Sequence, residues 1–151
     1  MAATTIKAAR QALRDQILAM SGTAYGGTWK ETVFPLGILD EPANRGHLAF
    51  SIVDEATENT AHRGKSGETI AHTLRLRVSF LYQLTPAAAD LMDGWDLSSD
   101  ALQDVIQALY DQGAWTDDLY VRFERSNRTR LSDTAWLQID AFFSVEHELT
   151  V

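Results

Sequence analysis

The sequence predicts an α+β fold: a mostly antiparallel sheet of four or five strands, with an N-terminal helix and a central helical segment packed on one face. Apolar residues recur at helical spacing over residues 6–20, and side chains alternate strictly over residues 70–82 and 135–146. Two pairs of strands, each joined by a polar connection, enclose the helical stretch. Strands that follow one another through hairpins pair antiparallel, and helices then cover one face of the sheet.

The first element is an amphipathic helix. Thr4 or Thr5 offers an N-cap oxygen, and Ser21 followed by glycine is a helix-stop signal. The apolar face consists of positions three or four residues apart: Ile6, Ala9, Leu13, Ile17 and Met20. Between residues 22 and 46, glycine and proline interrupt every pattern, which predicts a long connection containing one short strand or turn.

The middle of the chain gives the strongest strand signal. Residues 47–53 form a short mixed strand, and residues 69–82 form a long one with one buried face. The polar segment between them predicts a hairpin with a protruding arm over residues 54–69. His72 lies in register with Leu74 and is expected at the rim of the packed face.

The second half of the chain also contains helix and strand patterns. Proline at position 86 favours a first helical piece to about residue 92, and Ser98 or Ser99 can cap a second helix that ends at Gly113. A strand follows at 119–124, then a polar turn at 125–133, then the long strand that starts at residue 135. The sequence contains no internal repeat and no sign of a second domain, so we expect a single α+β domain over residues 1–151.

Composition excludes several classes of function. Only 13 basic residues stand against 21 acidic ones, a net charge of −8, so tight binding of nucleic acid is not expected. The absence of cysteine excludes disulfides, zinc–thiolate sites and a cysteine nucleophile, and fits folding in a reducing cytoplasm. No apolar run approaches the roughly 18 residues of a membrane helix, and the first residues do not resemble a secretory signal.

No motif for catalysis, metal or cofactor binding is complete. Lys65 sits between glycine and serine as in a phosphate-binding loop, but position 59 holds Asn59 where that loop needs glycine. Glu146 and Glu148 share one face of a strand, where a solvated edge is the simpler interpretation. No two of the four histidines stand at metal-ligand spacing: His47, His62, His72 and His147. We therefore predict that the chain is not an enzyme and carries no cofactor.

Two aromatic residues of the last strand are candidate contact residues. Trp136 and Phe142 lie on the same strand face, opposite the apolar positions. If that face has no helix over it, the aromatics indicate a partner surface, since an aromatic patch is unfavourable on a monomer. If helices cover both faces, they are core residues. The sequence leaves both interpretations open.

The order of elements resembles the tail terminator proteins of long-tailed bacteriophages such as lambda. The shared pattern includes the capped N-terminal helix, a loop with Phe34 before proline, a short strand and a polar arm. After the long strand and the helices come the strand around Val121 and an aromatic-rich strand near the C-terminus. The resemblance covers nearly the whole chain but is one of pattern, and the basic residues Arg63 and Lys65 depart from the more acidic arm of the family.

This resemblance implies a structural protein of the virion tail, assembled in the bacterial cytoplasm. Such a protein forms a hexameric ring that caps the tail tube, ends tail polymerisation and provides the surface for head–tail joining. Its partners would be further copies of itself, the tube protein and a neck or head completion protein. DNA would pass through the ring without specific binding, helped by net negative charge. The residues expected to make contacts are Arg63, Lys65, Glu68, Trp136 and Phe142.

Two alternatives remain at the level of sequence. The chain could be another tail or neck subunit of the same fold, such as a tail completion or tube protein. It could instead be a small-molecule-binding domain with a pocket that uses His72, Tyr82 or Trp136.

Overall fold

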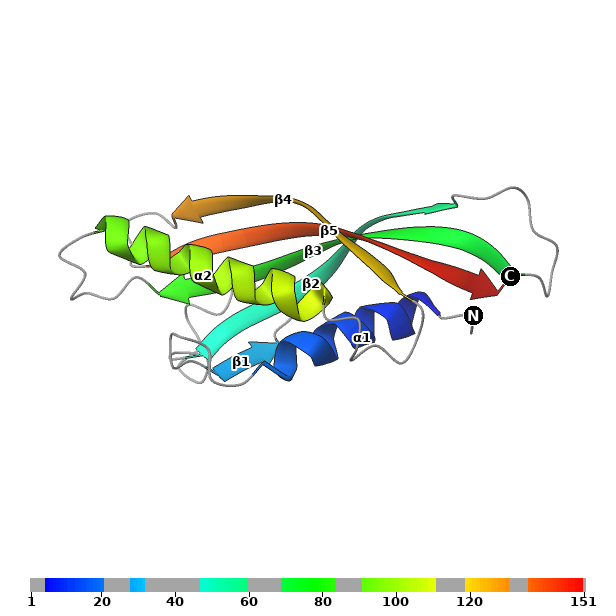
Figure 1. The fold of residues 1–151 in the computed structure, drawn as a ribbon, viewed down its shortest axis with the longest axis horizontal. Helices are drawn as coiled ribbons and strands as arrows, with labels where there is room; N and C mark the ends of the chain where they lie inside the picture. Colours follow the sequence, from blue (N-terminus) through cyan, green and yellow to red (C-terminus); the bar gives the residue numbers. More distant parts are fainter. Residues whose placement is uncertain are drawn as a thin grey trace.

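The computed structural model describes residues 5–20, 28–31, 47–59, 69–83, 91–110, 119–130 and 136–150. Figure 1 shows its elements, which follow one another along the chain as α1 (Ile6–Leu18), β1 (Thr28–Glu31), β2 (His47–Asn59), β3 (Thr69–Gln83), α2 (Leu91–Tyr110), β4 (Tyr120–Arg130) and β5 (Trp136–Thr150). The predicted α+β class is confirmed.

The five strands form one sheet in the order β1-β2-β3-β5-β4. Three of the four strand pairs are antiparallel, and only the short β1 runs parallel to its neighbour β2. The central pair, β3 and β5, is in register over its full length, from Thr69 opposite Thr150 to Gln83 opposite Trp136. The sheet is therefore mostly antiparallel, as predicted, and β1 and β4 are its edge strands.

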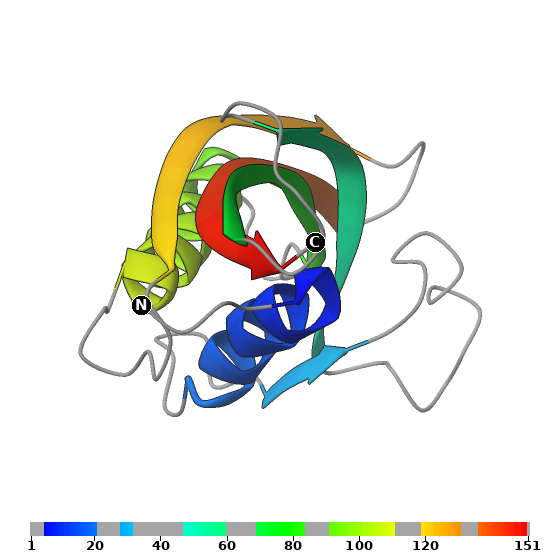
Figure 2. The ribbon, with the colours of Figure 1, turned by 90° about the vertical axis from the view of Figure 1, so that its right-hand side faces the viewer.

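The sheet is strongly twisted. In Figure 1 the strands run from β4 at the top to β2 at the bottom on the left, and in the reverse order on the right. Figure 2 shows the same coiling along the long axis. Such twist follows from the right-handed twist of each strand, which accumulates along strands as long as the 15-residue β3 and β5.

One face of the sheet carries the core. Alternate residues of β3 and β5 point into it, and Leu13 of α1 and Val105 of α2 are fully buried in the same cluster. Both described helices thus cover the same face, as the sequence predicts. The largest fully buried side chains on this face are Phe50, Phe80, Phe143, Leu13, Ile17, Leu74, Leu76, Leu109, Leu137, Ile139 and Val78. Leu81 is also fully buried, but it points to the opposite face of β3.

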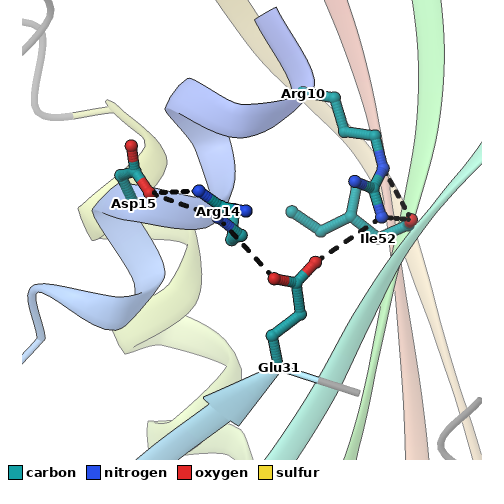
Figure 3. A network of polar contacts seen from close by, with 5 residues as sticks. All are labelled: Arg10, Arg14, Asp15, Glu31 and Ile52. Carbon is teal, nitrogen blue, oxygen red and sulfur yellow. Dashed lines mark hydrogen bonds and ion pairs between the residues drawn. The ribbon is translucent and has the colours of Figure 1, made fainter. Parts of the chain in front are cut away.

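Polar contacts fix α1 against the β1 side of the sheet (Figure 3). The helix begins with the predicted cap, in which the Thr5 hydroxyl accepts a hydrogen bond from the Ala8 amide at 3.1 Å. Arg10 donates from Nε and Nη2 to the Ile52 carbonyl of β2, at 3.1 and 2.9 Å. Glu31 of β1 lies between Arg10 and Arg14, 3.6 Å from each guanidinium. The helix is therefore joined to β1 and to its neighbour β2.

The first long strand ends later than its apolar pattern predicts. We expected it to stop at residue 53, but β2 continues to Asn59 and pairs with His72 at that end. Backbone pairing with the long β3 holds this part of β2, and pairing leaves no apolar signature in the sequence. Residues 54–59 and 69 of the predicted hairpin arm thus belong to the paired strands β2 and β3, and that the arm protrudes stays a prediction. Residues 60–68 lie outside the described residues.

The central helical segment differs from prediction as well. Instead of two helices with a cap at Ser98 or Ser99, α2 is continuous from Leu91 to Tyr110 and includes glycine 94. Ser98 is buried inside it and donates its hydroxyl to the Trp95 carbonyl at 2.5 Å. A serine in mid-helix can satisfy its hydroxyl this way, so it does not have to end a helix.

The fourth strand is longer than predicted. We expected a turn from residue 125, but β4 continues to Arg130 and pairs with β5 throughout. Its register shifts between Phe123 and Arg125, which marks a β-bulge. A bulge changes the alternation of the strand at that point. The pattern that ends at residue 124 in the sequence therefore marks a bulge in the strand.

Candidate interaction surface

The face of the sheet opposite the core is the first candidate surface, here called the helix-free face. Neither described helix packs on it, because α1 and α2 both contribute to the core side. On β5 it contains the residues between the buried core positions, and on β3 the residues that alternate with Leu74 to Phe80. Trp136 and Phe142 both lie on this face and are half-buried. Within the described chain, the alternative that helices cover both faces is wrong.

A polar network occupies the β3–β5 part of the helix-free face. Ser79 and Asp140 are directly opposite each other in the sheet, and the Ser79 hydroxyl donates to Asp140 Oδ1 at 2.6 Å. The Gln138 amide donates to the same carboxylate at 3.1 Å. A short hydrogen bond to a carboxylate is stronger than one between neutral groups. These three side chains therefore satisfy one another within the face.

Aromatic and charged side chains occupy the β4 part of the same face. The guanidinium of Arg125 stands over the Phe142 ring, 3.9 Å from its centroid. Arg75 of β3 reaches across β5 to Glu124 of β4 with an N···O distance of 3.2 Å. The stacked cation shields the ring and contributes about 0.5–1 kcal/mol. The predicted aromatic patch is therefore partly covered by arginine, a combination that is common where proteins meet.

The β4 edge is the second candidate surface. Arg128 donates to the Trp95 carbonyl at 3.1 Å and to the Ser99 hydroxyl at 2.8 Å, which joins β4 to the beginning of α2. At the other end of α2, the Tyr110 hydroxyl accepts from the Phe123 amide at 2.6 Å. Trp95 and Tyr110 nevertheless remain 40% and 43% exposed, so they offer aromatic surface beside an edge strand. Sequence spacing gave no sign of these contacts, because they join a helix to a strand.

A buried histidine pair lies between β3 and β5. His72 and His147 are directly opposite each other, with His72 Nδ1 3.0 Å from His147 Nε2 and the rings edge to face. His147 Nδ1 lies 3.3 Å from the Glu148 carbonyl. If His147 Nδ1 donates there, its Nε2 can accept a hydrogen bond from His72 Nδ1. Burial, and then the neighbouring His147, lower the pKa of His72. The sequence separation of 75 residues hid this pair.

The structure does not assemble the other candidate sites. His72 and Tyr82 lie ten residues apart on β3, about 33 Å along an extended strand, and Trp136 lies on the other face of the sheet. These three residues cannot line one small pocket together, and a pocket that uses one of them stays a prediction. Among the described residues no group of three or more potential metal ligands comes together. Arg63, Lys65 and Glu68 lie outside the described residues, so their expected contacts remain predictions.

In the described residues, the geometry defines a class of fold: a coiled five-stranded sheet with two helices on one face and an exposed β4 edge. No protein-family model matches the sequence, and no curated protein matches it. A solved structure does share the fold, a chain in the "Virion of native gene transfer agent (GTA) particle". The match has a TM-score of 0.61 and 19% identity, and it covers 92% of this chain and 93% of that chain. In the described part of the chain, neither helix has the length and apolarity to span a membrane.

Proposed function

We propose that this chain is a structural subunit of a phage or phage-like particle that caps the tail tube as a ring. In this role it ends tail polymerisation and provides the surface for head–tail joining. The observation that carries the proposal is the fold, which matches a chain of a gene transfer agent virion over nearly the full length of both. The order of elements, which resembles that of the tail terminators, also supports the proposal.

The surface chemistry fits a subunit that works by contact. A ring subunit needs surfaces that join unlike patches of successive copies, and it needs no reaction centre. The sheet offers a long edge strand, β4, and exposed aromatic residues beside it. The net charge of −8 would repel DNA phosphates and let DNA pass through a central opening.

The partners follow from this role. The chain would bind further copies of itself, most simply six, then the tube protein on one side and a neck or head completion protein on the other. It would be found in the virion at the head–tail junction after assembly in the host cytoplasm. We expect a structural role without catalysis, in which Trp136 and Phe142 contribute to a contact surface.

Two measurements test the proposal. Light scattering after size exclusion should give a mass of about six subunits or a monomer–hexamer equilibrium. Purified chain added to polymerising tube protein should stop growth, and electron microscopy should show density at one tube end. Incorporation all along the tube would instead identify a tube subunit. Unchanged tube growth without any bound chain would contradict a role at the tube end.

A further inference from the structure

The β4 rim is a surface of unusual composition. We define it as aromatic and arginine side chains of β4 and of the adjoining side of α2, all exposed except the half-buried Arg128: Trp95, Tyr110, Tyr120, Arg122, Arg125 and Arg128. Tyr120 is 53% exposed, more than any other large hydrophobic residue described. Tryptophan, tyrosine and arginine are the residues enriched at the centres of protein interfaces. The composition indicates a surface for a protein partner.

The β4 rim also differs from the rest of the chain in charge. The strand carries four arginines and one glutamate in 11 residues, whereas the whole chain has a net charge of −8. Glu124 is paired with Arg75, and Arg125 stacks on Phe142. Arg122 is exposed and makes no ion pair with another described residue. The rim is therefore a basic strip that suits an acidic partner surface.

An acidic strip lies on α2. The helix contains four aspartates and no lysine or arginine. Asp96 and Asp100 are exposed, Asp104 is half-buried, and none of the three forms an ion pair with another described residue. Aspartates four residues apart in a helix repel each other by about 0.2–0.5 kcal/mol per pair. Burial and the nearby Asp100 raise the pKa of Asp104. We call these three residues the acidic flank.

The two strips lie on different sides of α2. Trp95 faces β4 through its contacts with Arg128. The three aspartates follow at about 100°, 140° and 180° around the helix from Trp95. Asp100 is close enough to Tyr82 of β3 to contribute, after burial, to raising the pKa of that hydroxyl. The acidic flank therefore begins beside the β4 rim, where Asp96 follows Trp95 and Asp100 follows Ser99, and it turns along α2 toward β3, which β5 separates from β4.

We infer that the β4 rim of one copy binds the acidic flank of α2 on a second copy, so that successive copies join head to tail. Aspartate carboxylates can accept hydrogen bonds from arginine and from unpaired amides of an edge strand. A contact between two unlike patches repeats and closes into a ring when the rotation allows. The inference rests on the proposed ring and adds which surfaces form it.

Charge reversal tests the contact with one change on each surface. Arg122→Glu and Asp100→Lys should each weaken self-association by on the order of tenfold or more, because like charges then face each other. The double variant Arg122→Glu/Asp100→Lys restores opposite charges and should recover association. Self-association is measured by light scattering across a concentration series, with circular dichroism to check that each variant is folded.

Matched controls separate this contact from net charge. Lys7→Glu and Asp54→Lys change exposed residues on α1 and β2 by the same charge, and should leave association unchanged. Association of the Arg122→Glu variant at wild-type strength would overturn the docking inference while the ring itself stands. A wild-type chain that remains monomeric both in solution and at tube ends would overturn the ring and the docking together.

Cross-linking tests the direction of the contact. The chain contains no cysteine, so each introduced cysteine is unique. A mixture of the Arg122→Cys and Asp100→Cys variants should form dimers with a short bis-maleimide, and neither variant should do so alone. Dimers formed by the Arg122→Cys variant alone would indicate a symmetric contact between two β4 rims and would overturn the head-to-tail arrangement.

Discussion

The two edges of the sheet are protected in different ways. At the β1 edge, a short strand covers the start of β2, and the Arg10 guanidinium binds the Ile52 carbonyl just beyond it. At the β4 edge, an 11-residue strand pairs only with β5, and side chains of α2 contact it at Phe123 and Arg128. The first edge is closed by a core helix, whereas the second keeps aromatic and arginine side chains exposed.

This difference assigns the edges different roles. Changes on the β1 side should reduce the stability of the monomer, because α1 both fills the core and binds the outer strands there. Changes on the β4 side should have small effects on folding and large effects on association. The following variants test this division in order of expected effect on stability.

The largest effect is expected from the buried side of α1. Leu13 is fully buried, so Leu13→Ala should lower the free energy of unfolding by about 2–5 kcal/mol through lost burial and a cavity. Urea denaturation, monitored by circular dichroism, measures the free energy of unfolding. Leu18 on the same helix is 44% exposed, and Leu18→Ala should stay within about 0.5 kcal/mol. Equal losses in the two variants would mean that α1 does not pack as described.

A smaller loss is expected at the polar closure of the β1 edge. Arg10→Ala removes two charged hydrogen bonds to the Ile52 carbonyl, and should reduce the free energy of unfolding by about 1.5 kcal/mol. Arg14→Ala is the control, since Arg14 is a surface ion-pair residue whose loss should have an effect of at most about 1 kcal/mol. If Arg14→Ala is the more harmful change, the edge is not closed by Arg10.

These same regions show what the sequence can and cannot predict. The periodicities over α1, β3 and β5 were sufficient to predict that these elements exist and which of their faces are buried, because those faces contact one continuous core. Strand ends at Asn59 and Arg130 were missed, because there backbone pairing continues after apolar alternation stops. The continuous α2 was missed because glycine 94 and Ser98 are usual helix-boundary residues that here lie inside a helix.

The candidate surfaces were predictable only in part. The alternation of β5 placed Trp136 and Phe142 on the face away from the core, and they are there. The pairing of Arg125 with Phe142 depends on the register of β4 after its bulge, which no local pattern encodes. The His72–His147 pair requires that β3 and β5 be neighbours, a fact of topology. Contacts between elements distant in sequence are thus the part that patterns do not specify.

The central strands should respond to acid, unlike the edges. The pKa of His72 is lowered below its ordinary value of 6.5, so below that value the unfolded chain binds more protons than the folded one. Stability should therefore fall as the pH decreases from about 7 to 5, by at most about 1.4 kcal/mol per pH unit for one proton.

The His72→Gln variant should show a flatter profile of unfolding free energy against pH. NMR titration of the His72 ring tests the lowered pKa directly, and its midpoint in the folded wild type should lie below 6.5. A midpoint at or above that value would mean that burial beside His147 does not favour the neutral form of His72. A variant with an unchanged pH profile would assign the acid sensitivity to another group.

The smallest effect on stability is expected at the β4 edge itself. Tyr110→Phe removes the hydroxyl that accepts from the Phe123 amide, but water can take its place because Tyr110 is 43% exposed. We expect a loss of about 0.5 kcal/mol, together with faster hydrogen exchange of the Phe123 amide. Tyr120→Phe, a change at an exposed tyrosine on the same strand, should leave that exchange rate unchanged. A loss as large as that of Arg10→Ala would mean that side chains at the β4 edge stabilise the monomer as those at the β1 edge do. That result would contradict the division of roles between the two edges.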